Sequence, residues 1–511
     1  MSKFEDYFDK NFIHLKDEQK NIENLLSENM YLISGDFYGI QKFIFEGLTT
    51  KNAAKVLRAK SAFVQLLTSV ISKYICEKLQ IEEKYILSTN AGKFEILSPK
   101  IDENIMQDIQ KIINEYFIKN FYGLSGINIC FVSCETNDFK DSKKYKNLRE
   151  KIAKEIEKSK FKKFDLQTQE PILSYDENIT NQTLCKICNI RKIKHEDSCD
   201  ICDDFIKLGK KLTTYKIDEI IKSDSIGIKF DDFICDVIID EKIKSYVAKE
   251  DTKDEKNKIL EFQDFAKKSQ GTEAIAVLKA DVDGMGNFIK NSDITASFEN
   301  FDLFSKTIDN FFSLHIPRKM QENFKNTYTV FAGGDDLFLL GSWNVILELA
   351  RFIESEFKSF IKSKEITISF GIAMAKPSKP ISYLANETEH LLETSKELDG
   401  KDAITLFGET VKCDSYKEVF DEFSNAFKAF ENKEINTAFL YRLLEFCEMS
   451  KKVKYDGDIL STIWKSKLSY SFSRNNDNLG ENIYKILDEK IDNNPKETKM
   501  FLSEFIYKRR K

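Results

Sequence analysis

Three acidic residues in the second half of the chain have the types and spacing expected of a divalent metal site. Asp281 follows an apolar run, residues 274–280, that predicts a buried strand, and Asp335 and Asp336 lie between two further strand-like runs. Carboxylates that converge repel one another unless a cation neutralises them, and their hard oxygen atoms favour Mg²⁺ or Mn²⁺. We therefore predict that Asp281, Asp335 and Asp336 are catalytic metal ligands. Asp283, two residues further along, either joins them as a ligand or only shapes the turn.

The residues beside these carboxylates indicate a nucleotide as the substrate. Two metal ions would hold the phosphates of a nucleotide and activate a ribose hydroxyl for attack on its α-phosphate. Gly333 and Gly334 form the turn before Asp335 and remove side-chain bulk where a substrate must approach closely. A second glycine-rich turn offers backbone N–H groups to phosphate oxygens, and its candidate nucleotide-binding residues are Gly284, Gly286, Asn287 and Phe288. The alternative, a solvated acidic turn, is disfavoured because the two acidic sites occur together.

A second constellation, of four cysteines, predicts a structural zinc site. Cys185 and Cys188 form one Cys-x-x-Cys pair, and Cys199 and Cys202 form another ten residues after the first. Two such pairs supply the four thiolates of a closed, tetrahedral Zn²⁺ site, which holds a fold together and performs no chemistry. His195 lies between the pairs and could replace one cysteine, although four thiolates suffice. A thioredoxin-like redox pair fits poorly, because there are two pairs and no flanking βαβ pattern.

Two stretches of the chain carry the same predicted order of elements. The first has a strand at 31–34, a helix at 53–79, hairpin strands at 85–88 and 93–97, a helix at 104–118 and a strand at 127–134. Residues 274–407 repeat this order, with the two glycines at the tip of the hairpin. The order is that of a ferredoxin-like α+β domain, in which the first strand and the hairpin are neighbours. Residues 415–511 show only helical periodicity.

Charged runs separate these stretches. Residues 140–163 are dominated by charge, which is typical of a solvated helix or a linker, and residues 249–258 form another such run. We therefore expect an α+β chain of five parts. They are an N-terminal helical segment (1–28), a first ferredoxin-like domain (29–150), a linker and zinc-knuckle domain (151–250), a second ferredoxin-like domain that carries the acidic site (251–411) and a helical C-terminal domain (412–511).

The composition excludes several classes of protein. The 511 residues include 78 Lys and Arg and 84 Asp and Glu, so the net charge is −6, and 41% of the residues are hydrophobic. These values suit a folded protein and argue against disorder and against non-specific coating of nucleic acid. No stretch is long and apolar enough to span a membrane, and the charged N-terminus is unlike a signal peptide, so we expect a cytoplasmic protein. None of the four His precedes an Asp, and no Walker loop or Ser-His-Asp elbow is present.

The motifs together resemble the large subunit of type III CRISPR effector complexes, of the Csm (III-A) kind. Its catalytic palm domain is similar to Leu278-Lys-Ala-Asp281-Val-Asp283-Gly-Met-Gly286, Phe331-Ala-Gly-Gly-Asp-Asp-Leu-Phe338, Ile368-Ser-Phe-Gly371-Ile and Ala403-Ile-Thr-Leu-Phe-Gly408. Its first, non-catalytic palm is similar to Leu32-Ile-Ser-Gly35-Asp36-Phe-Tyr-Gly39-Ile-Gln41-Lys-Phe-Ile44 and Ala54-Lys-Val-Leu57-Arg58-Ala-Lys-Ser61. The likeness includes the four-cysteine knuckle and spans residues 30–410.

The resemblance implies a fold and an activity. Both ferredoxin-like domains would be palms of the nucleotidyl cyclase type, and the second would polymerise ATP into cyclic oligoadenylate once a crRNA-guided complex with other Csm-type subunits binds target RNA. It implies that Lys396 and Lys401 approach the phosphates and that Gly39 and Gln41 of the first palm bind nucleotide. Family members commonly begin with a nuclease domain bearing a His-Asp pair, whereas residues 1–28 are too few for one. We therefore expect no DNase activity of that type from this chain.

The resemblance also has departures and competitors. Asn90-Ala91-Gly92 stands where the family has a run of glycines, and Tyr38 stands where it has a small residue. The same palm chemistry could join AMP to another small molecule, which mass spectrometry of the product would reveal. A diguanylate cyclase has a related Gly-Gly-(Asp/Glu)-Glu-Phe palm and would use GTP alone, but Asp336 and Leu337 depart from that motif. A catalytically silent RNA-binding scaffold would need an inactive metal site.

Overall fold

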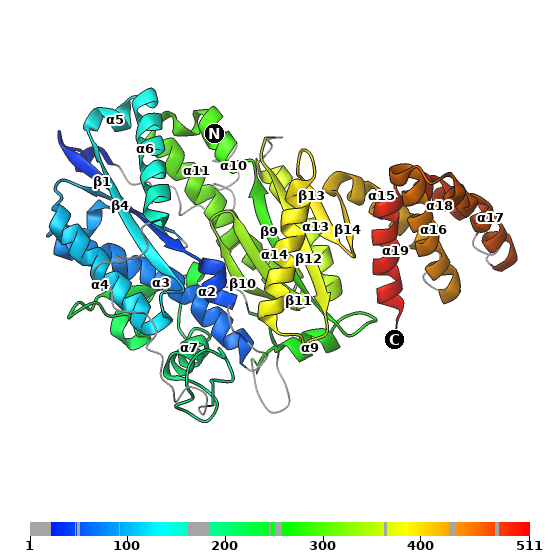
Figure 1. Cartoon of the computed structure of the whole chain (residues 1–511), viewed down its shortest axis with the longest axis horizontal. Coiled ribbons are helices and arrows are strands. Elements are labelled where there is room, and N and C mark those ends of the chain that lie inside the picture. Colours follow the sequence, from blue (N-terminus) through cyan, green and yellow to red (C-terminus); the bar gives the residue numbers. More distant parts are fainter. Residues whose placement is uncertain are drawn as a thin grey trace.

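A computed structural model describes residues 22–45, 48, 52–90, 92–161, 183–244, 247–250, 258–361, 365–428, 435–475 and 480–510. The helical segment expected at 1–28 lies outside these residues except for a 3₁₀ turn, η2 (Ile22–Leu25). Along the long axis in Figure 1, a first sheet with its helices is followed by a second sheet and then by a helical C-terminal part. Among the described residues, no helix combines the length and the apolar composition needed to cross a membrane.

The first sheet contains four antiparallel strands. In chain order they are β1 (Met30–Tyr38), β2 (Ile86–Asn90), β3 (Lys93–Ser98) and β4 (Gly126–Cys134), and their order across the sheet is β2-β3-β1-β4. Alternate residues of β1 enter different cores, because successive side chains of a strand point to opposite faces. Ile33 and Phe37 pack with α3 (Ala53–Lys78) and α4 (Glu103–Phe121), whereas Met30 and Leu32 lie in a separate cluster on the other face.

The charged stretch at 140–163 is not a solvated linker. After the short helix α5 (Thr136–Lys140), it forms α6 (Ser142–Lys160), and Tyr145, Leu148 and Ile152 of this helix are buried against the second face of the first sheet. These three apolar residues follow helical spacing and outweigh the surrounding charge, which stays on the solvent side. The expectation of a helix is therefore confirmed, although one face of this helix is buried, and the domain boundary expected at residue 150 falls inside α6.

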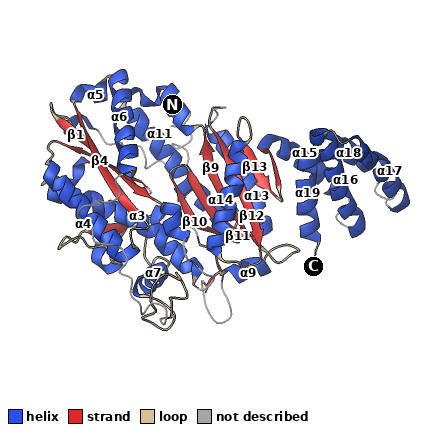
Figure 2. Cartoon of the chain, in the orientation of Figure 1, coloured by secondary structure: helices blue, strands red, loops and turns tan. Residues whose placement is uncertain are grey.

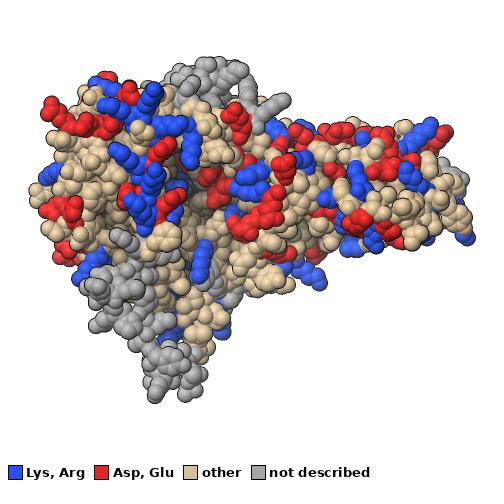
Figure 3. All heavy atoms as spheres, turned by 45° about the horizontal axis from the view of Figure 1, so that its top comes forward, with Lys and Arg blue, Asp and Glu red and all other residues tan. Residues whose placement is uncertain are grey.

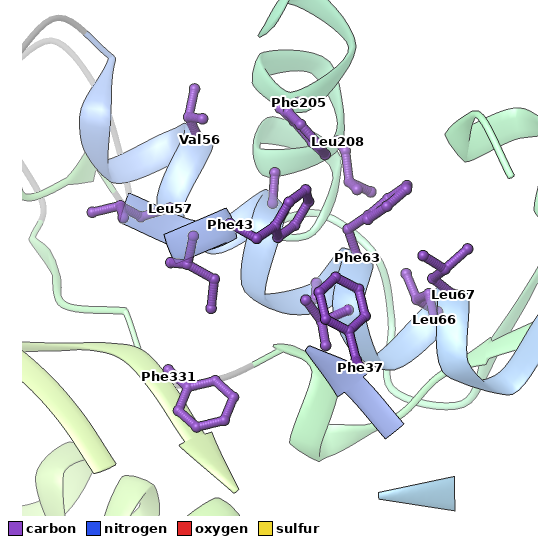
Figure 4. Packing of buried hydrophobic residues seen from close by; sticks show 14 of the residues in the cluster. Phe37, Phe43, Val56, Leu57, Phe63, Leu66, Leu67, Phe205, Leu208 and Phe331 are labelled. Atoms are coloured by element: carbon purple, nitrogen blue, oxygen red, sulfur yellow. The ribbon is translucent and has the colours of Figure 1, made fainter. Parts of the chain in front are cut away.

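A small insert links the two sheets. It contains α7 (Asp200–Lys211), a two-stranded sheet of β5 (Glu219–Lys222) and β6 (Asp236–Ile239), the helix α8 (Glu241–Lys244), a second pair of strands, β7 (Lys249–Glu250) and β8 (Lys258–Ile259), and α9 (Phe262–Lys267). Phe205 and Leu208 of α7 pack against Phe43 and Phe63 of the first part, and Phe331 of the second sheet belongs to the same cluster (Figure 4). One continuous core therefore joins the first part, the insert and the second sheet.

The second sheet has the strand order β10-β11-β9-β12-β13-β14. Its strands are β9 (Ile275–Asp283), β10 (Thr327–Gly333), β11 (Asp336–Ser342), β12 (Thr367–Ala375), β13 (Ala403–Leu406) and β14 (Glu409–Lys412). The first four repeat the β2-β3-β1-β4 order of the first sheet, as the sequence predicted, and β13 and β14 extend the sheet at one edge. The helices α11 (Phe298–Asn310), α12 (Ile316–Asn323) and α13 (Trp343–Ile361) contribute to the core on one face, while α14 (Ile381–Glu397) packs on β12 and β9.

The C-terminal part is entirely helical in its described residues (Figure 2). Its helices are α15 (Cys413–Lys428), α16 (Thr437–Asp456), α17 (Trp464–Asn475), α18 (Glu481–Asn493) and α19 (Pro495–Arg509). They enclose a core of their own. The link to the second sheet includes a buried ion pair, in which Arg351 of α13 donates to Glu504 of α19 at 2.9 Å. The glutamate side chain is only 2% exposed, so this pair is buried where the two parts meet.

Candidate functional site

Strand pairing brings two of the predicted acidic residues opposite each other. In the antiparallel register of β9 and β11, Asp281 is paired with Asp336, and the N–H of Val282 donates to the carbonyl oxygen of Asp335 at 3.2 Å. Directly opposed residues of paired strands project from the same face of a sheet, so both side chains leave on one side. The sequence placed Asp281 just after its strand, whereas β9 continues to Asp283 because β12 pairs with it along its whole length.

Two of the three carboxylates, those of Asp281 and Asp336, nevertheless have separate partners. The Asp281 carboxylate forms an ion pair with Lys396, and Gln41 of the first part donates to Asp336 Oδ2 at 3.4 Å. In the part of the chain that the structure describes, the four cysteines form the one group in which three or more metal-ligand atoms lie within 4.8 Å of one another. Uncompensated carboxylates repel, so Asp281 is paired with a cation and Asp336 accepts from an amide donor. The backbone register brings the acidic residues together, while their side chains remain apart.

The surroundings of Asp336 fit a divalent cation. Burial raises the pKa of Asp336, the nearby Asp335 and Glu389 raise it as well, and the positive Lys279 lowers it. Lys279 lies two residues before Asp281, is 4% exposed and forms an ion pair with Glu389 of α14. Its charge is therefore shared with Glu389 and cannot fully neutralise the aspartates. A buried carboxylate whose pKa is raised, as that of Asp336 is, and whose charge is incompletely compensated is the kind of group that Mg²⁺ or Mn²⁺ stabilises.

Asp283 is mainly a structural residue here. Its side chain is 3% exposed, and its Oδ2 accepts hydrogen bonds from Thr367 Oγ1 at 2.9 Å, Ser369 Oγ at 2.7 Å and the N–H of Asp402 at 3.1 Å. These bonds tie β9 to β12 and to the residue that precedes β13. Its Oδ1 is buried without a hydrogen-bond partner, so this second oxygen is the atom available to a cation.

The glycine turn is held from outside by residues that the sequence did not single out. Gly334 has a φ of +63°, a left-handed conformation that favours glycine, and its N–H donates to Asp309 Oδ1 at 2.9 Å. Asp309 lies on α11, is 4% exposed and also pairs with Lys242 of α8. The insert thus reaches the acidic turn through one buried carboxylate. No motif marks Asp309 or Lys242, because each looks like an ordinary charged residue of a helix.

The predicted nucleotide-binding residues occupy different environments. Gly284, with a φ of +74°, precedes the short helix α10 (Met285–Asn291), on which Gly286 and Asn287 are exposed. Phe288 instead packs against Phe304, with ring centroids 5.8 Å apart, so it belongs partly to the core. Gly333 is the last residue of β10 and is buried.

Of the two predicted phosphate-binding lysines, Lys396 lies at the site. It contacts Asp281, and burial lowers the pKa of Lys396 to about 8, helped by the positive charges of Lys401 and Lys279. Lys401 is exposed, beyond the end of α14, and has a positive φ of 47°. From the first part, Gly39 begins the short helix α2 (Ile40–Phe45) in a left-handed conformation, and Gln41 on that helix reaches Asp336.

The four predicted zinc ligands come together in the insert. Cys185, Cys188, Cys199 and Cys202 are all buried, and their sulfur atoms lie within 4.8 Å of one another. The pKa of Cys188 is lowered, chiefly because the thiols of Cys199 and Cys202 donate hydrogen bonds to its sulfur. His195 is not part of this group, since its Nε2 lies 3.1 Å from Asp200 and its side chain is half exposed. The cluster has the donors and compactness of a tetrahedral metal site.

Comparisons with known proteins give matches for both the first part of the chain and the second sheet. Residues 274–405 match the family model "Cas10/Cmr2, second palm domain", and residues 29–178 match "Csm1 subunit domain B". A protein of Methanocaldococcus jannaschii named CRISPR system single-strand-specific deoxyribonuclease Cas10/Csm1 (subtype III-A) is 29% identical, over 76% of this chain and 61% of the relative. A Streptococcus thermophilus protein of the same name is 24% identical, over 82% and 59%. The chain therefore spans about three fifths of the length of these relatives.

Solved structures share the fold. The Csm1–Csm4 cassette in complex with AMPPNP superposes with a TM-score of 0.70 at 18% identity, covering 97% of this chain and 71% of the other. The same cassette in complex with cA4 gives a TM-score of 0.69 at 18% identity, covering 94% and 70%. At this level of identity the likeness concerns the mixed α+β fold, with its second palm domain and its helical C-terminal region.

The contact between Asp309 and the glycine turn leads to a first prediction. In Asp309→Ala, the Gly334 N–H loses its charged acceptor, so we expect amide exchange of a peptide spanning 331–338 to accelerate by about tenfold or more, as for the loss of a charge-assisted bond. Asp309→Asn keeps an acceptor oxygen and should give a smaller change. The control is Asp302→Ala on the same helix, an equally buried residue paired with Lys306. Equal exchange in Asp309→Ala and the parent protein would contradict this role.

Proposed function

We propose a function from the premise that this chain belongs to the Cas10/Csm1 family of type III-A CRISPR systems. The second sheet is a nucleotidyltransferase palm that converts ATP to a cyclic oligoadenylate. The observation that carries the proposal is the pairing of Asp281 with Asp336, with Asp335 in the adjoining turn. Related folds have been solved in complexes described as containing AMPPNP and cA4, which supports an adenine nucleotide as the substrate.

The residues of the chain have distinct tasks in this reaction. Two Mg²⁺ or Mn²⁺ ions held by Asp281, Asp335 and Asp336, with Asp283 Oδ1 as a further ligand, would polarise the phosphate and favour ionisation of the attacking ribose hydroxyl. Lys396 lies beside Asp281 and can move its charge to the triphosphate once cations take over the carboxylate. Asp309 fixes the Gly334 backbone and so holds Asp335 in place. Gln41 orients Asp336 through its amide.

The first sheet is proposed as a second, non-catalytic palm. It has the same strand order as the first four strands of the catalytic sheet, and its helix α2 lies against β11, with Phe45 and Phe338 ring centroids 4.4 Å apart. Gln41 therefore reaches the acidic site from a different domain, and Gly39 precedes the helix that carries it. A site between two palms could hold two nucleotides, one as the attacking hydroxyl and one as the activated phosphate, which is what joining ATP to ATP requires.

We further propose that the chain works in a crRNA-guided complex with other Csm-type subunits, among them one of the Csm4 type, and that target RNA activates it. Activation by a distant RNA needs two states of the palm, and RNA must bind the competent state more tightly. The pairing of Asp281 with Lys396 is compatible with a resting state, since the ammonium group competes with a metal ion for the carboxylate. We do not propose for this chain the deoxyribonuclease activity that the relatives' names state.

The enzymatic proposal is tested by removing two of the carboxylates. In Asp335→Asn plus Asp336→Asn, the amide side chains keep the shape but not the charge, so metal affinity falls. We expect product formation from ATP, Mg²⁺ and cognate RNA by the assembled complex to fall by about 10²-fold or more. The matched control is Asp232→Asn, a fully exposed aspartate of the insert. The product is identified by mass spectrometry.

Each result of this experiment has a meaning. Undiminished cyclic product from the double variant would contradict the assignment of the metal ligands. A linear product that joins AMP to another molecule would keep the site but change the acceptor, and exclusive use of GTP would favour the diguanylate cyclase alternative. If the parent complex forms no product when RNA is added, the scaffold function replaces the enzymatic one.

The cysteine cluster is proposed to hold a structural zinc ion. We expect the purified chain to contain about one zinc per chain, because four thiolates form a closed tetrahedral site. In Cys202→Ser, the metal should be lost and the insert should unfold more easily, since metal binding supplies folding energy. Metal analysis and thermal melting measure both effects. Cys76→Ser, which changes a buried cysteine of α3 outside the cluster, is the control and should retain the metal. Zinc content unchanged in Cys202→Ser would contradict the assignment.

A further inference from the structure

The N-terminus of α3 faces a basic cavity far from the acidic turn. The cavity has a volume of about 930 Å³ and lies between the start of α3, the end of α7 and the segment from β8 to α9. In Figure 1, α7 and α9 lie along the same lower edge of the molecule. Tyr328, near the start of β10, donates to the carbonyl oxygen of Ala54 at 2.6 Å. Because the glycine turn is at the other end of β10, this cavity is separate from the proposed palm site.

An unpaired buried cation lies at this cavity. Arg58 lines it, is 1% exposed and donates through Nε to the carbonyl oxygen of Gly209 at 3.0 Å. Its Nη1 and Nη2 are buried without any hydrogen-bond partner. The face of Tyr328, 5.8 Å away, provides a weak cation–π contact. A guanidinium with two buried and unsatisfied nitrogens is strongly unfavourable, unless an anion completes its shell.

The backbone of α3 adds to the same attraction. Helix N-termini carry partial positive charge and free N–H groups, which acidic side chains usually satisfy. The first turn of α3 contains no acidic residue, and the side chain of Asn52 at the N-cap makes no capping hydrogen bond. Lys55 is in that turn, and Asn52 Oδ1 accepts from its ammonium group at 3.3 Å. Lys55 and Arg58 therefore place two cations near the positive end of a 26-residue helix, and an anionic ligand would stabilise this arrangement.

The remaining walls are also suited to phosphate. Lys210, Lys249 and Lys258 line the cavity, together with the hydroxyl groups of Thr213 and Thr214. Among the described residues, Glu261 is the one carboxylate of the lining, and it caps α9 by accepting from that helix's backbone. Lysine ammonium groups and threonine hydroxyls are common phosphate ligands. Elsewhere, on the face drawn in Figure 3, acidic and basic side chains are interspersed, so the five-to-one excess of cations among the described lining residues is a local feature.

The position of Arg58 is set by a close helix crossing. A Cβ on Gly209 would lie 2.2 Å from the carbonyl oxygen of Lys55, so only glycine allows α7 to approach α3 this closely. The crossing brings the Gly209 carbonyl oxygen to Arg58 Nε and brings Lys210 to the cavity wall. The buried guanidinium is therefore held in one place by the fold before any ligand binds, as expected of a preorganised site.

We propose that this cavity binds a phosphate group, carried by a nucleotide or by an RNA strand. Arg58 and the N-terminus of α3 form the inner part of the site, and Lys210 and Lys249 form its rim. The volume exceeds that of a single phosphate, so the site has room for the attached sugar and base, next to Phe262 and Pro377. This inference does not depend on the palm chemistry, and each can fail without the other.

The test measures binding of a fluorescein-labelled short oligouridine to the full chain by fluorescence polarisation, at low salt and without added divalent ions. We expect Lys210→Gln and Lys249→Gln each to weaken binding about threefold to tenfold and to reduce the slope of log K against log salt by about one. The matched control is Lys211→Gln, the same charge change on the neighbouring exposed residue of α7, which does not line the cavity. Arg58→Lys keeps the positive charge but loses the two Nη donors of the guanidinium group, and it should also weaken binding.

Competition identifies the source of the phosphate. If unlabelled ATP and pyrophosphate displace the probe as well as oligouridine does, the site takes a free nucleotide. If only oligouridine displaces the probe, the site takes the backbone of a strand. The proposal is overturned if no saturable binding is found, or if Lys211→Gln weakens binding as much as Lys210→Gln and Lys249→Gln do. The rim variants decide the outcome even if Arg58→Lys melts early.

Discussion

The register between β9 and β11 is the constraint on which the acidic site depends. Asp281 opposes Asp336 only in this register, and a shift by one residue would move every side chain of β11 to the other face of the sheet. The register is fixed by burial on both faces of β9. Ala276, Leu278 and Ala280 enter the core shared with α11 and α13, while Ile275 and Val277 enter the core that continues into the first part. The burial of the apolar residues of β9 thus fixes the position of Asp281 opposite Asp336.

Charge compensation then decides what the site can hold. Three acidic groups near the turn have a basic partner, namely Lys396 for Asp281, Lys242 for Asp309 and Lys279 for Glu389. Asp335 and Asp336 lie among these pairs with less compensation, and burial raises the pKa of Asp336. Because the compensating lysines come from α14, β9 and the insert, movement of any of these elements would change the affinity of the turn for cations. This gives a physical route by which partners could control the site.

Much of this organisation could be predicted from the sequence, since it follows from local patterns. The apolar runs predict β9, β10 and β11, the glycine pair predicts the turn, and the cysteine spacing predicts the cluster in the insert. What could not be predicted depends on tertiary contacts. Asp309 and Lys242 act only because α11 and α8 meet behind the turn. The helix α6 looked solvated because its three buried apolar residues are few among many charges. The role of Asp283 depends on β12 pairing beyond the strand that the sequence suggested.

The central claim is that the acidic residues aligned by β9 and β11 share divalent ions beside a nucleotide. The most direct measurement is a crystal structure of the chain with Mn²⁺ and a non-hydrolysable ATP analogue, with the ions located by anomalous scattering. The account predicts two peaks about 4 Å apart, bound by oxygens of Asp281 and Asp336, with the ammonium group of Lys396 moved from Asp281 to the phosphates. It would be contradicted if nucleotide bound elsewhere, or if Lys396 stayed on Asp281 and no anomalous peak lay at the turn.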